Sequence, residues 1–269
     1  MNDAEYQKVT VTVKKHLNLD LDFYKPNQMM RRLAGFIGRV GADNVNEFCS
    51  LIETDADVRE KVMNFMTINV IEFFRDTRHF DMLRSTVLPE ILKKNPRPKI
   101  WSAGSSRGAE AYSVAMMIED IAPGTKAQIV GTDLDVNIIA QANAGGPYPD
   151  AEAKNISASL RDRFMKKKAD RHYVNSEIRS KVKFKEQNLL TDRFEGGFDL
   201  IMCRNVVIYF SDEAKHGLNK KFSAALKPDG ILFIGGTETI LNPRDFGFDR
   251  DAAAFYRKST APAQITRAA

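Results

Sequence analysis

The chain has 269 residues, of which 43% are hydrophobic and 28% are charged. This balance is typical of a folded globular protein and excludes a chain that is mainly disordered, fibrous or built on a disulfide framework. The four histidines and the two distant cysteines, Cys49 and Cys203, form no metal-ligand motif, so we expect no metal site. The N-terminus has no signal-peptide pattern and no apolar run reaches ~18 residues, so we expect a cytoplasmic protein without membrane insertion.

The net charge of +5 is spread unevenly along the chain. Residues 151–185 contain eleven Lys or Arg and four Asp or Glu, which gives this segment alone a net charge of +7. Residues 23–42 lack acids and contain four basic residues: Lys25, Arg31, Arg32 and Arg39. Such surfaces attract nucleic acid, anionic lipid or acidic protein, but charge alone also fits a face that is only solvated.

Residues 1–75 are expected to form a small helical domain, because their apolar residues recur at helical spacing. One apolar stripe consists of Met29, Leu33, Phe36, Ile37 and Val40. Arg32 and Arg39 are seven residues apart, on a face directed away from this stripe. Asp43 and Asp55 are expected to be the N-caps of two further helices.

A linker helix is expected at residues 76–96, and an α/β domain at residues 97–258. Apolar runs alternate there with helical stretches. The runs are at 99–103, 127–132, 198–203 and 231–235, and the helical stretches are at 109–121, 136–144 and 212–226. This alternation predicts a doubly wound, mostly parallel sheet built from βαβ units.

The basic segment at about 150–185 interrupts this alternation, so we expect it to form a small inserted subdomain. Residues 171–174 and 182–184 have the composition of short strands, which predicts a β insert. The last residues, 259–269, have little to bury and are expected to be a loose tail.

Ligands of open α/β sheets bind beyond the carboxyl ends of the strands, so the loops there are the candidate site. Gly104 and Gly108 allow a tight turn at a helix N-terminus, but their spacing matches neither a dinucleotide-binding motif nor a P-loop. Asp133 follows the next strand, where a carboxylate can accept hydrogen bonds from ribose hydroxyls. This combination fits either a nucleoside site or only a tight turn with a helix cap. Asn188 and Asn205 follow later strands, and amide side chains there suit an adenine edge.

Short motifs follow one another along the chain in a distinctive order. They are Met66-Thr67-Ile68-Asn69, Glu72-Phe73-Phe74-Arg75, Trp101-Ser102-Ala103, Gly108 with Glu110, Gly131-Thr132-Asp133, Asn188-Leu189-Leu190, Cys203-Arg204-Asn205 with Ile208-Tyr209-Phe210, and Leu226-Lys227-Pro228-Asp229-Gly230. In this order they resemble the chemotaxis receptor methyltransferases, the CheR family. The resemblance extends over roughly residues 5–257.

The resemblance implies a Rossmann-like methyltransferase fold with a helical N-terminal domain and a β insert. It also implies that S-adenosylmethionine is used to methylate glutamate side chains of chemoreceptors, with S-adenosylhomocysteine as the product. A glutamate carboxylate is already an anionic nucleophile at neutral pH, so such an enzyme mainly aligns and desolvates the two reactants. No Ser-His-Asp apparatus is required.

The same resemblance assigns roles to individual residues. Arg75 and Tyr209 would orient the acceptor glutamate, while Glu110 would bind the amino group of the cofactor and Asp133 its ribose. The expected cofactor site consists of Asn69, Arg75, Gly104, Glu110, Asp133, Asn188, Leu189, Arg204 and Asn205. The acidic helix bundle of the receptor is expected to dock on Arg31, Arg32 and Arg39, and in this family the insert also docks on receptors. We expect a monomer with no nucleic-acid partner.

Four positions depart from the family pattern. Ile71 replaces a usual Thr or Ser, and Arg107, Ala109 and Ala111 lie in a glycine loop that commonly has Ser, Thr, Glu and Pro. The lost groups would remove about 1–3 kcal/mol of hydrogen bonding to the cofactor. Arg107 would preserve the affinity if it bound the cofactor's carboxylate, and the sequence is compatible with both outcomes.

Two other functions fit part of this pattern. The four departures are compatible with a catalytically weak or inactive receptor-binding module. The basic insert and a pI near 9.1 are compatible with a nucleic-acid methyltransferase, but the sequence has no stacked aromatic platform or base-directed catalytic loop.

Overall fold

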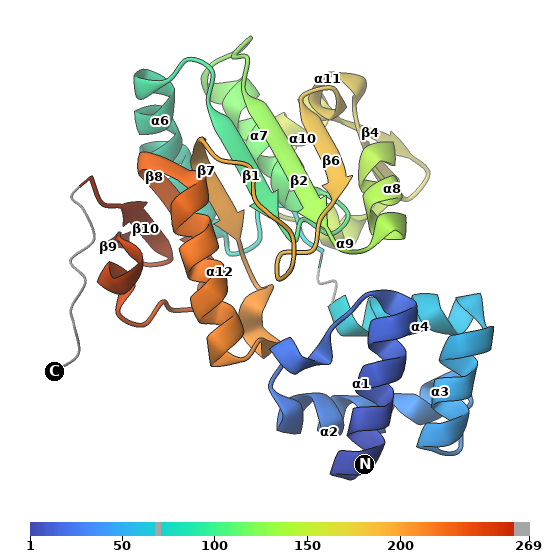
Figure 1. Cartoon of the computed structure of the whole chain (residues 1–269). Helices are drawn as coiled ribbons and strands as arrows, with labels where there is room; N and C mark the ends of the chain where they lie inside the picture. Colours follow the sequence, from blue (N-terminus) through green and yellow to red (C-terminus); the bar gives the residue numbers. More distant parts are fainter. Residues whose placement is uncertain (68–70, 261–269) are drawn as a thin grey trace, which may run out of the picture. The chain divides into compact units, whose positions relative to one another are not determined.

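The computed structural model describes residues 1–67 and 71–260, which form two compact units (Figure 1). Residues 1–69 and 206–217 make up the first, here named the helical unit. Residues 70–205 and 218–269 make up the second, the sheet unit. The expected domain boundary at residue 75 thus lies nearer residue 70, and the helical unit also includes a short segment from far along the chain. No helix in the described part of the chain is both long and apolar enough to cross a membrane.

Short amphipathic helices bury their apolar faces in the core of the helical unit. Its elements are α1 (Asp3–Leu17), η1 (Leu21–Phe23), α2 (Pro26–Ile37), η2 (Gly38–Val40), α3 (Val45–Thr54), α4 (Ala56–Thr67) and η4 (Val207–Tyr209). The predicted stripe of α2 is confirmed at Met29, Leu33, Phe36 and Ile37, which are all buried. Phe36 stacks on Phe65 of α4 with a ring-centroid distance of 4.0 Å.

The starts of α3 and α4 depend on side-chain caps. Asp55 caps α4 as predicted, since its Oδ1 accepts the Asp57 N–H at 2.8 Å. The prediction of Asp43 as a cap is wrong, because Asn44 accepts the Glu47 N–H at 3.1 Å and caps α3. Asp43 instead donates its own N–H to the Glu47 carboxylate. Asp43 and Asn44 are both residue types that can cap a helix, and α3 begins after the second of them.

A short segment from far along the chain, residues 206–217, belongs to the helical unit. Lys25 donates its N–H to the Tyr209 carbonyl at 3.0 Å, and Ser211 donates its N–H to the Phe23 carbonyl at 2.7 Å. The rings of Tyr24 and Phe210 form an edge contact with a centroid distance of 5.1 Å. These contacts fix Tyr209 to residues near the start of α2.

The sheet unit contains a seven-stranded sheet with the order β6-β2-β1-β7-β8-β10-β9. Its strands are β1 (Lys99–Ala103), β2 (Gln128–Asp133), β6 (Val182–Glu186), β7 (Phe198–Cys203), β8 (Leu226–Ile234), β9 (Phe248–Ala252) and β10 (Phe255–Lys258). The strands from β6 to β8 in this order pair in parallel, and β10 is antiparallel to β8 and to β9. The predicted fold class and the four predicted apolar strands are confirmed. The hairpin of β9 and β10 is not among the predicted strands.

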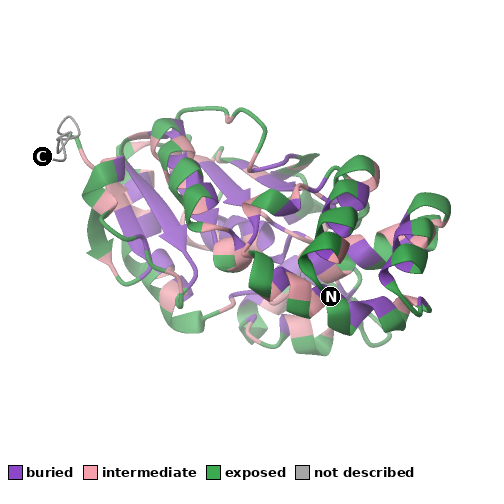
Figure 2. Cartoon of the chain, turned by 60° about the horizontal axis from the view of Figure 1, so that its bottom comes forward, coloured by how far each residue is buried: buried purple, intermediate pink, exposed green. Residues whose placement is uncertain are grey.

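Helices cover both faces of this sheet, with α7 behind it and α12 in front in Figure 1. The helices are α5 (Thr77–Met82), the π-helix η3 (Leu83–Val87), α6 (Leu88–Lys94), α7 (Ala109–Ile121), α8 (Val136–Ala144), α12 (Asp212–Ala225) and η5 (Pro243–Phe246). Of α12, only residues 218–225 belong to the sheet unit. Trp101 of β1 packs against Phe222 of α12 with a centroid distance of 5.6 Å. Figure 2 shows that the strands are mostly buried, whereas the helices expose one face.

The insert lies between α8 and β6 in sequence and has its own small sheet. Its elements are β3 (Tyr148–Pro149), α9 (Asp150–Ala153), α10 (Ala158–Phe164), β4 (Met165–Lys168), β5 (Arg171–Val174) and α11 (Ser176–Arg179), and its antiparallel strands have the order β3-β5-β4. Residues 182–184, expected in the insert, instead belong to β6, which pairs in parallel with β2. The expected insert at 150–185 is corrected accordingly, because the short apolar pattern fits an edge strand of either sheet.

Glu195 links two strands of the large sheet from a connecting loop. Its Oε1 lies 2.5 Å from Lys185 Nζ of β6, and its Oε2 lies 3.0 Å from Lys99 Nζ of β1. Hydrogen bonds from Lys185 and Lys99 lower the pKa of Glu195 to about 2. The carboxylate is half-exposed, so solvent reduces the energy of these ion pairs.

We expect Glu195→Gln to lower the free energy of unfolding at pH 7 by about 0.5–1 kcal/mol. The folded-state pKa lies below the unfolded value of 4.5, so this stabilisation is present above pH 4.5 and is lost as the pH falls toward 2. Urea titrations should therefore give a smaller difference at pH 3 than at pH 7. Glu186→Gln removes a neighbouring carboxylate that forms no ion pair among the described residues and serves as the control. Equal differences at both pH values would contradict the assignment.

Candidate functional site

The candidate site lies at the carboxyl ends of β1, β2 and β7. The neighbours of β1 are β2 on one side and β7 on the other, so the connections that leave these strands diverge at this point. Such a switch in strand order opens a crevice where α/β proteins bind ligands. The predicted residues Gly104, Glu110, Asp133, Arg204 and Asn205 all lie at or just beyond these strand ends.

The glycine loop, residues 104–108, turns from β1 into α7. The N–H groups of Gly104 and Ser105 both donate to the Thr132 carbonyl at 2.8 Å, which joins the loop to the end of β2. Gly108 has a positive φ of 88°, and a Cβ there would meet the Phe184 ring at 2.6 Å. Only glycine fits this position without a shift of the ring.

Asp133 is buried beside this loop. Its Oδ2 accepts the Ser106 N–H at 2.8 Å, and its Oδ1 accepts the Asp135 N–H at 3.2 Å. Burial raises the pKa of Asp133, while these backbone hydrogen bonds lower it. The N-cap of α8 is Asp135, which accepts the Asn137 and Ile138 N–H groups. The helix-cap interpretation therefore applies to Asp135 and not to Asp133.

Arg204 connects three parts of the site. Its Nη1 lies 3.4 Å from Glu110 Oε2 at the start of α7, and its Nη2 donates to the Arg75 carbonyl at 2.9 Å and to Asp76 Oδ2 at 2.6 Å. Ser102 donates to the other Glu110 oxygen at 2.8 Å. The Arg204 side chain is only 2% exposed. Burial raises the pKa of Glu110, and the nearby Arg204 charge lowers it.

Asn205 adopts a left-handed conformation with φ of 59° directly after Arg204. Its N–H donates to Glu238 Oε2 at 3.0 Å, and the Gly235 N–H donates to the same oxygen at 2.6 Å. Glu238 thus holds the loops after β7 and β8 together. Glu238 is not among the predicted site residues, although its place in a polar run after an apolar strand is a usable signal.

Asn188 and Leu189 lie in a turn after β6. Asn188 Oδ1 accepts the Leu190 N–H at 3.0 Å, so the turn itself uses the oxygen that was expected at an adenine edge. Lys221 of α12 donates to the carbonyls of Leu189 and Leu190 at 2.9 and 3.1 Å. Leu189 is buried, and Lys221 fixes its main chain.

The segment before Arg75 is also held in place. Phe73 donates its N–H to the Glu152 carbonyl at 3.0 Å, and Phe74 donates its N–H to Ser113 Oγ of α7 at 3.1 Å. Arg75 is half-buried, and its carbonyl accepts from Arg204. Asn69 lies outside the described residues. Ile71 is half-buried at the start of this segment.

Tyr209 lies in the helical unit, and the contacts described for it are with residues of the same unit. The Arg32 guanidinium lies 4.4 Å from the centroid of the Tyr209 ring, and Arg32 Nη2 donates to the Phe65 carbonyl at 2.6 Å. Burial lowers the pKa of Arg32. Arg31 and Arg39 are exposed, whereas Arg32 is half-buried. The expectation that Arg32 and Arg39 share an open face is therefore corrected for Arg32, which packs on Tyr209.

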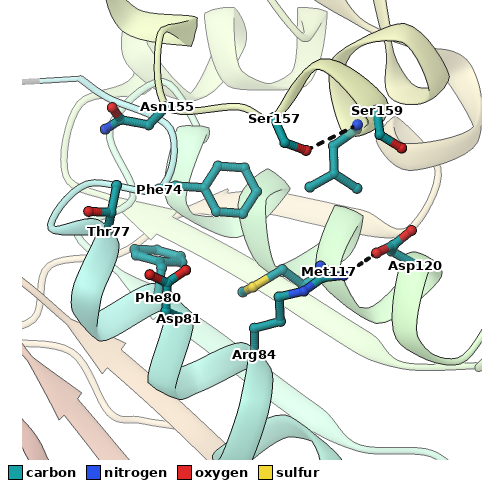
Figure 3. Close-up of a pocket in the computed structure, with 11 residues that line it drawn as sticks. Phe74, Thr77, Phe80, Asp81, Arg84, Met117, Asp120, Asn155, Ser157 and Ser159 are labelled. Atoms are coloured by element: carbon teal, nitrogen blue, oxygen red, sulfur yellow. Dashed lines mark hydrogen bonds and ion pairs between the residues drawn. The ribbon is translucent and has the colours of Figure 1, made fainter.

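A cavity of about 320 Å³ lies beside Phe74 and Phe80 (Figure 3). Its wall includes Met117 and the ion pair of Arg84 with Asp120. None of the predicted cofactor residues lines this cavity. It is thus separate from the strand ends that carry the candidate site.

Several buried polar atoms near the strand ends have no hydrogen-bond partner among the described residues: Ser105 Oγ, Arg204 Nε and Asn205 Oδ1. Such atoms are rare in folded proteins and are commonly satisfied by a ligand or water. Together with the Glu110 and Asp133 carboxylates, they fit a ligand with amino, carboxylate and hydroxyl groups, as S-adenosylmethionine has. Within the described ranges, no group of three His, Cys, Asp or Glu side chains is placed to hold a metal ion.

Comparisons with known proteins agree with this arrangement. Residues 69–252 match the family described as CheR methyltransferase, SAM binding domain, and residues 4–67 match CheR methyltransferase, all-alpha domain. The chemotaxis protein methyltransferase of Listeria monocytogenes is 38% identical over 258 residues, which cover 96% of this chain and 98% of the relative. Chemotaxis protein methyltransferase 1 of Pseudomonas aeruginosa is 34% identical over 254 residues, which cover 90% and 93%.

The chemotaxis protein methyltransferase of Escherichia coli is 28% identical over 249 residues, which cover 88% of this chain and 85% of the relative. None of these matches favours the inactive module or the nucleic-acid methyltransferase. The resemblance in the sequence motifs is confirmed, and the chain belongs to the CheR family of S-adenosylmethionine-dependent methyltransferases.

Proposed function

We propose that this protein methylates glutamate side chains on the cytoplasmic helical bundle of chemoreceptors, acting as a monomer in the cytoplasm. The observation that carries the proposal is the Arg204 cluster, which joins Glu110, Asp76 and the Arg75 segment at the strand ends of a SAM-binding domain. The names of the relatives point to the same chemotaxis substrates.

The sheet unit provides the cofactor site. Bound S-adenosylmethionine supplies an electrophilic methyl group, and transfer to a carboxylate breaks the carbon–sulfur bond, forms an ester bond and leaves S-adenosylhomocysteine. Glu110 is suited to bind the amino group of the cofactor and Asp133 its ribose hydroxyls. Gly104 lets the loop main chain approach the ligand, while Leu189, Asn188 and Asn205 provide main-chain and amide groups at the strand ends.

The acceptor glutamate needs orientation more than activation. Its carboxylate is an anionic nucleophile at neutral pH, so no general base has to remove a proton from it. Arg75 would attract this carboxylate by its charge, and Tyr209 would position it through its hydroxyl. The Arg32 guanidinium 4.4 Å from the Tyr209 centroid supports a fixed ring orientation.

Basic residues of the helical unit would meet the receptor. Arg31 and Arg39 are exposed on and just after α2, and this stretch contains no acid. Their charge suits an acidic helix bundle and would increase the rate and specificity of encounter. Arg32 would instead act through Tyr209. The exposed lysines of β4 in the insert, Lys166, Lys167 and Lys168, provide a second basic surface for the same partner.

Asp133→Asn is expected to weaken binding of S-adenosylhomocysteine by about 10- to 100-fold, because a hydrogen bond to a charged group contributes ~1.5–3 kcal/mol. Calorimetric titration of the parent and the variant measures this change. Asp162→Asn removes an exposed carboxylate of the insert and should bind as the parent does. A folded parent that does not bind the product would overturn the cofactor assignment, and so would an Asp133→Asn variant with parental affinity.

Tyr209→Phe is expected to lower kcat for receptor methylation by about 10- to 100-fold, because the hydroxyl is lost while the ring beside Arg32 remains. The affinity for S-adenosylhomocysteine should stay within about twofold of the parent. The assay follows transfer of a labelled methyl group to a purified receptor cytoplasmic fragment. Tyr173→Phe in the insert is the matched control. Parental kcat in the Tyr209 variant would refute the role of the hydroxyl.

The pair Arg31→Ala and Arg39→Ala should reduce kcat/KM for the receptor by about tenfold at low salt, mainly through KM. The difference should shrink as salt screens the attraction. Arg250→Ala removes an exposed charge from β9 in the sheet unit and should have no effect. A receptor KM that does not change in the double variant would show that α2 is not the docking helix.

A further inference from the structure

Arg107 is held by the insert from three sides. Its Nη1 lies 3.2 Å from Glu152 Oε1, its Nη2 donates to the Pro147 carbonyl, and its guanidinium lies 5.1 Å from the centroid of the Tyr148 ring. Tyr148 in turn donates its hydroxyl to the Arg107 carbonyl at 2.5 Å. Both the side chain and the main chain of this loop residue are therefore fixed by residues 147–152.

The same part of the insert also holds the segment that leads to Arg75. The Glu152 carbonyl accepts the Phe73 N–H at 3.0 Å, and the Phe73 ring packs edge-on against Tyr148 with a centroid distance of 4.8 Å. The Glu72 carboxylate lies 2.8 Å from Lys154 Nζ and accepts from Asn155 Nδ2 at 3.0 Å. One short stretch of the insert thus contacts the glycine loop and the Arg75 segment together.

These contacts close a ring of interactions around the candidate site. From Arg107 the path runs through Glu152 to Phe73 and on to Arg75, whose carbonyl accepts from Arg204. Arg204 then pairs with Glu110, which follows the glycine loop by two residues. Arg204 and Glu110 thus form one side of this ring, and Arg107 and Glu152 form the other.

The ion pair of Arg107 and Glu152 is shielded from solvent. Each side chain is 18% exposed, and Glu152 Oε2 is buried with no hydrogen-bond partner in the described part of the chain. Burial raises the pKa of Glu152, and the Arg107 charge opposes that rise. Removal of Arg107 alone would leave this largely buried carboxylate with only the Arg171 charge to compensate it, which is more costly than removal of both groups.

The sequence is compatible both with an Arg107 that binds the cofactor's carboxylate and with one that does not. These contacts distinguish between the two roles. Both terminal nitrogens of Arg107 are engaged by the insert, which favours a structural contact over binding of a cofactor carboxylate. Ala109 and Ala111 are buried and offer no polar side chain to a ligand. The loop is therefore fixed by a charge pair to the insert, in place of the hydroxyl and carboxylate groups that the family commonly has there.

We infer that Arg107 and Glu152 are positioning residues for methyl transfer, and that their ion pair fixes the glycine loop and the Arg75 segment in one arrangement. This inference rests on the proposed function and deepens it, because it makes the insert a structural part of the site as well as a docking surface. Neither side chain is assigned a contact with cofactor or acceptor, so both act through the main chain that they hold.

A double-mutant cycle tests this inference, with Arg107→Ala, Glu152→Gln and the double variant. Arg107→Ala is expected to raise both the Kd for S-adenosylhomocysteine and the KM for S-adenosylmethionine by about tenfold and to lower kcat by a similar factor. Glu152→Gln should have a smaller effect, and the double variant should be no worse than Arg107→Ala. Arg107→Lys, which keeps the charge, should recover part of the loss.

The matched control is Arg163→Ala, which breaks another ion pair of the insert, with Asp120 at 3.1 Å. It should lower the melting temperature slightly and leave the Kd for S-adenosylhomocysteine, the KM for S-adenosylmethionine and kcat at parental values. If Arg107→Ala behaves in the same way, or if the effects of the two single variants multiply in the double variant, the positioning role is overturned. A folded parent that neither binds S-adenosylhomocysteine nor methylates a receptor fragment would overturn the proposed function itself, and with it this inference.

Discussion

The buried guanidinium of Arg204 is the group on which the candidate site depends. It packs against the rings of Phe80 and Phe233, at 5.1 and 4.6 Å from their centroids, with its side chain 2% exposed. A charge in such a place is stable only when partners surround it, and here Glu110, Asp76 and the Arg75 carbonyl do so. Because those partners come from α7 and from the segment before α5, one side chain sets the relative positions of both.

The main elements of the fold could be predicted because apolar runs and helical periodicity fix them locally. The strands at 99–103 and 198–203 and the helices at 109–121 and 136–144 agree with the predicted bounds. The hairpin at 248–258 could not be predicted, because its charged residues hide the apolar–polar alternation of its strands and because its pairing with β8 is non-local. The prediction that residues 182–184 belong to the insert is wrong for a related reason, since a short strand carries no information about which sheet accepts it.

The placement of candidate residues at the strand ends could be predicted, but not the contacts that they make. The strand-end rule identifies Asp133, which directly follows an apolar run. The resemblance to the family adds Glu110 and Arg204. The engagement of Arg32 with Tyr209 and of Arg107 with Glu152 joins residues far apart in sequence, and no local pattern specifies those pairs. The role of Glu238 could not be predicted for the same reason, since its two hydrogen bonds connect loops that only the folded sheet brings together.

These contacts suit a reaction that requires alignment more than proton transfer. When the nucleophile is already an anion, most of the rate gain must come from holding it in line with the methyl group, where a displacement of about 1 Å can cost 10²-fold. Loops alone rarely hold such geometry, so their main chains need fixed anchors. Arg204 anchors one side of the glycine loop and the Arg75 segment, and the Arg107 and Glu152 pair anchors the other. If the proposed positioning role holds, the rigidity that the insert provides would offset the polar groups that this loop lacks.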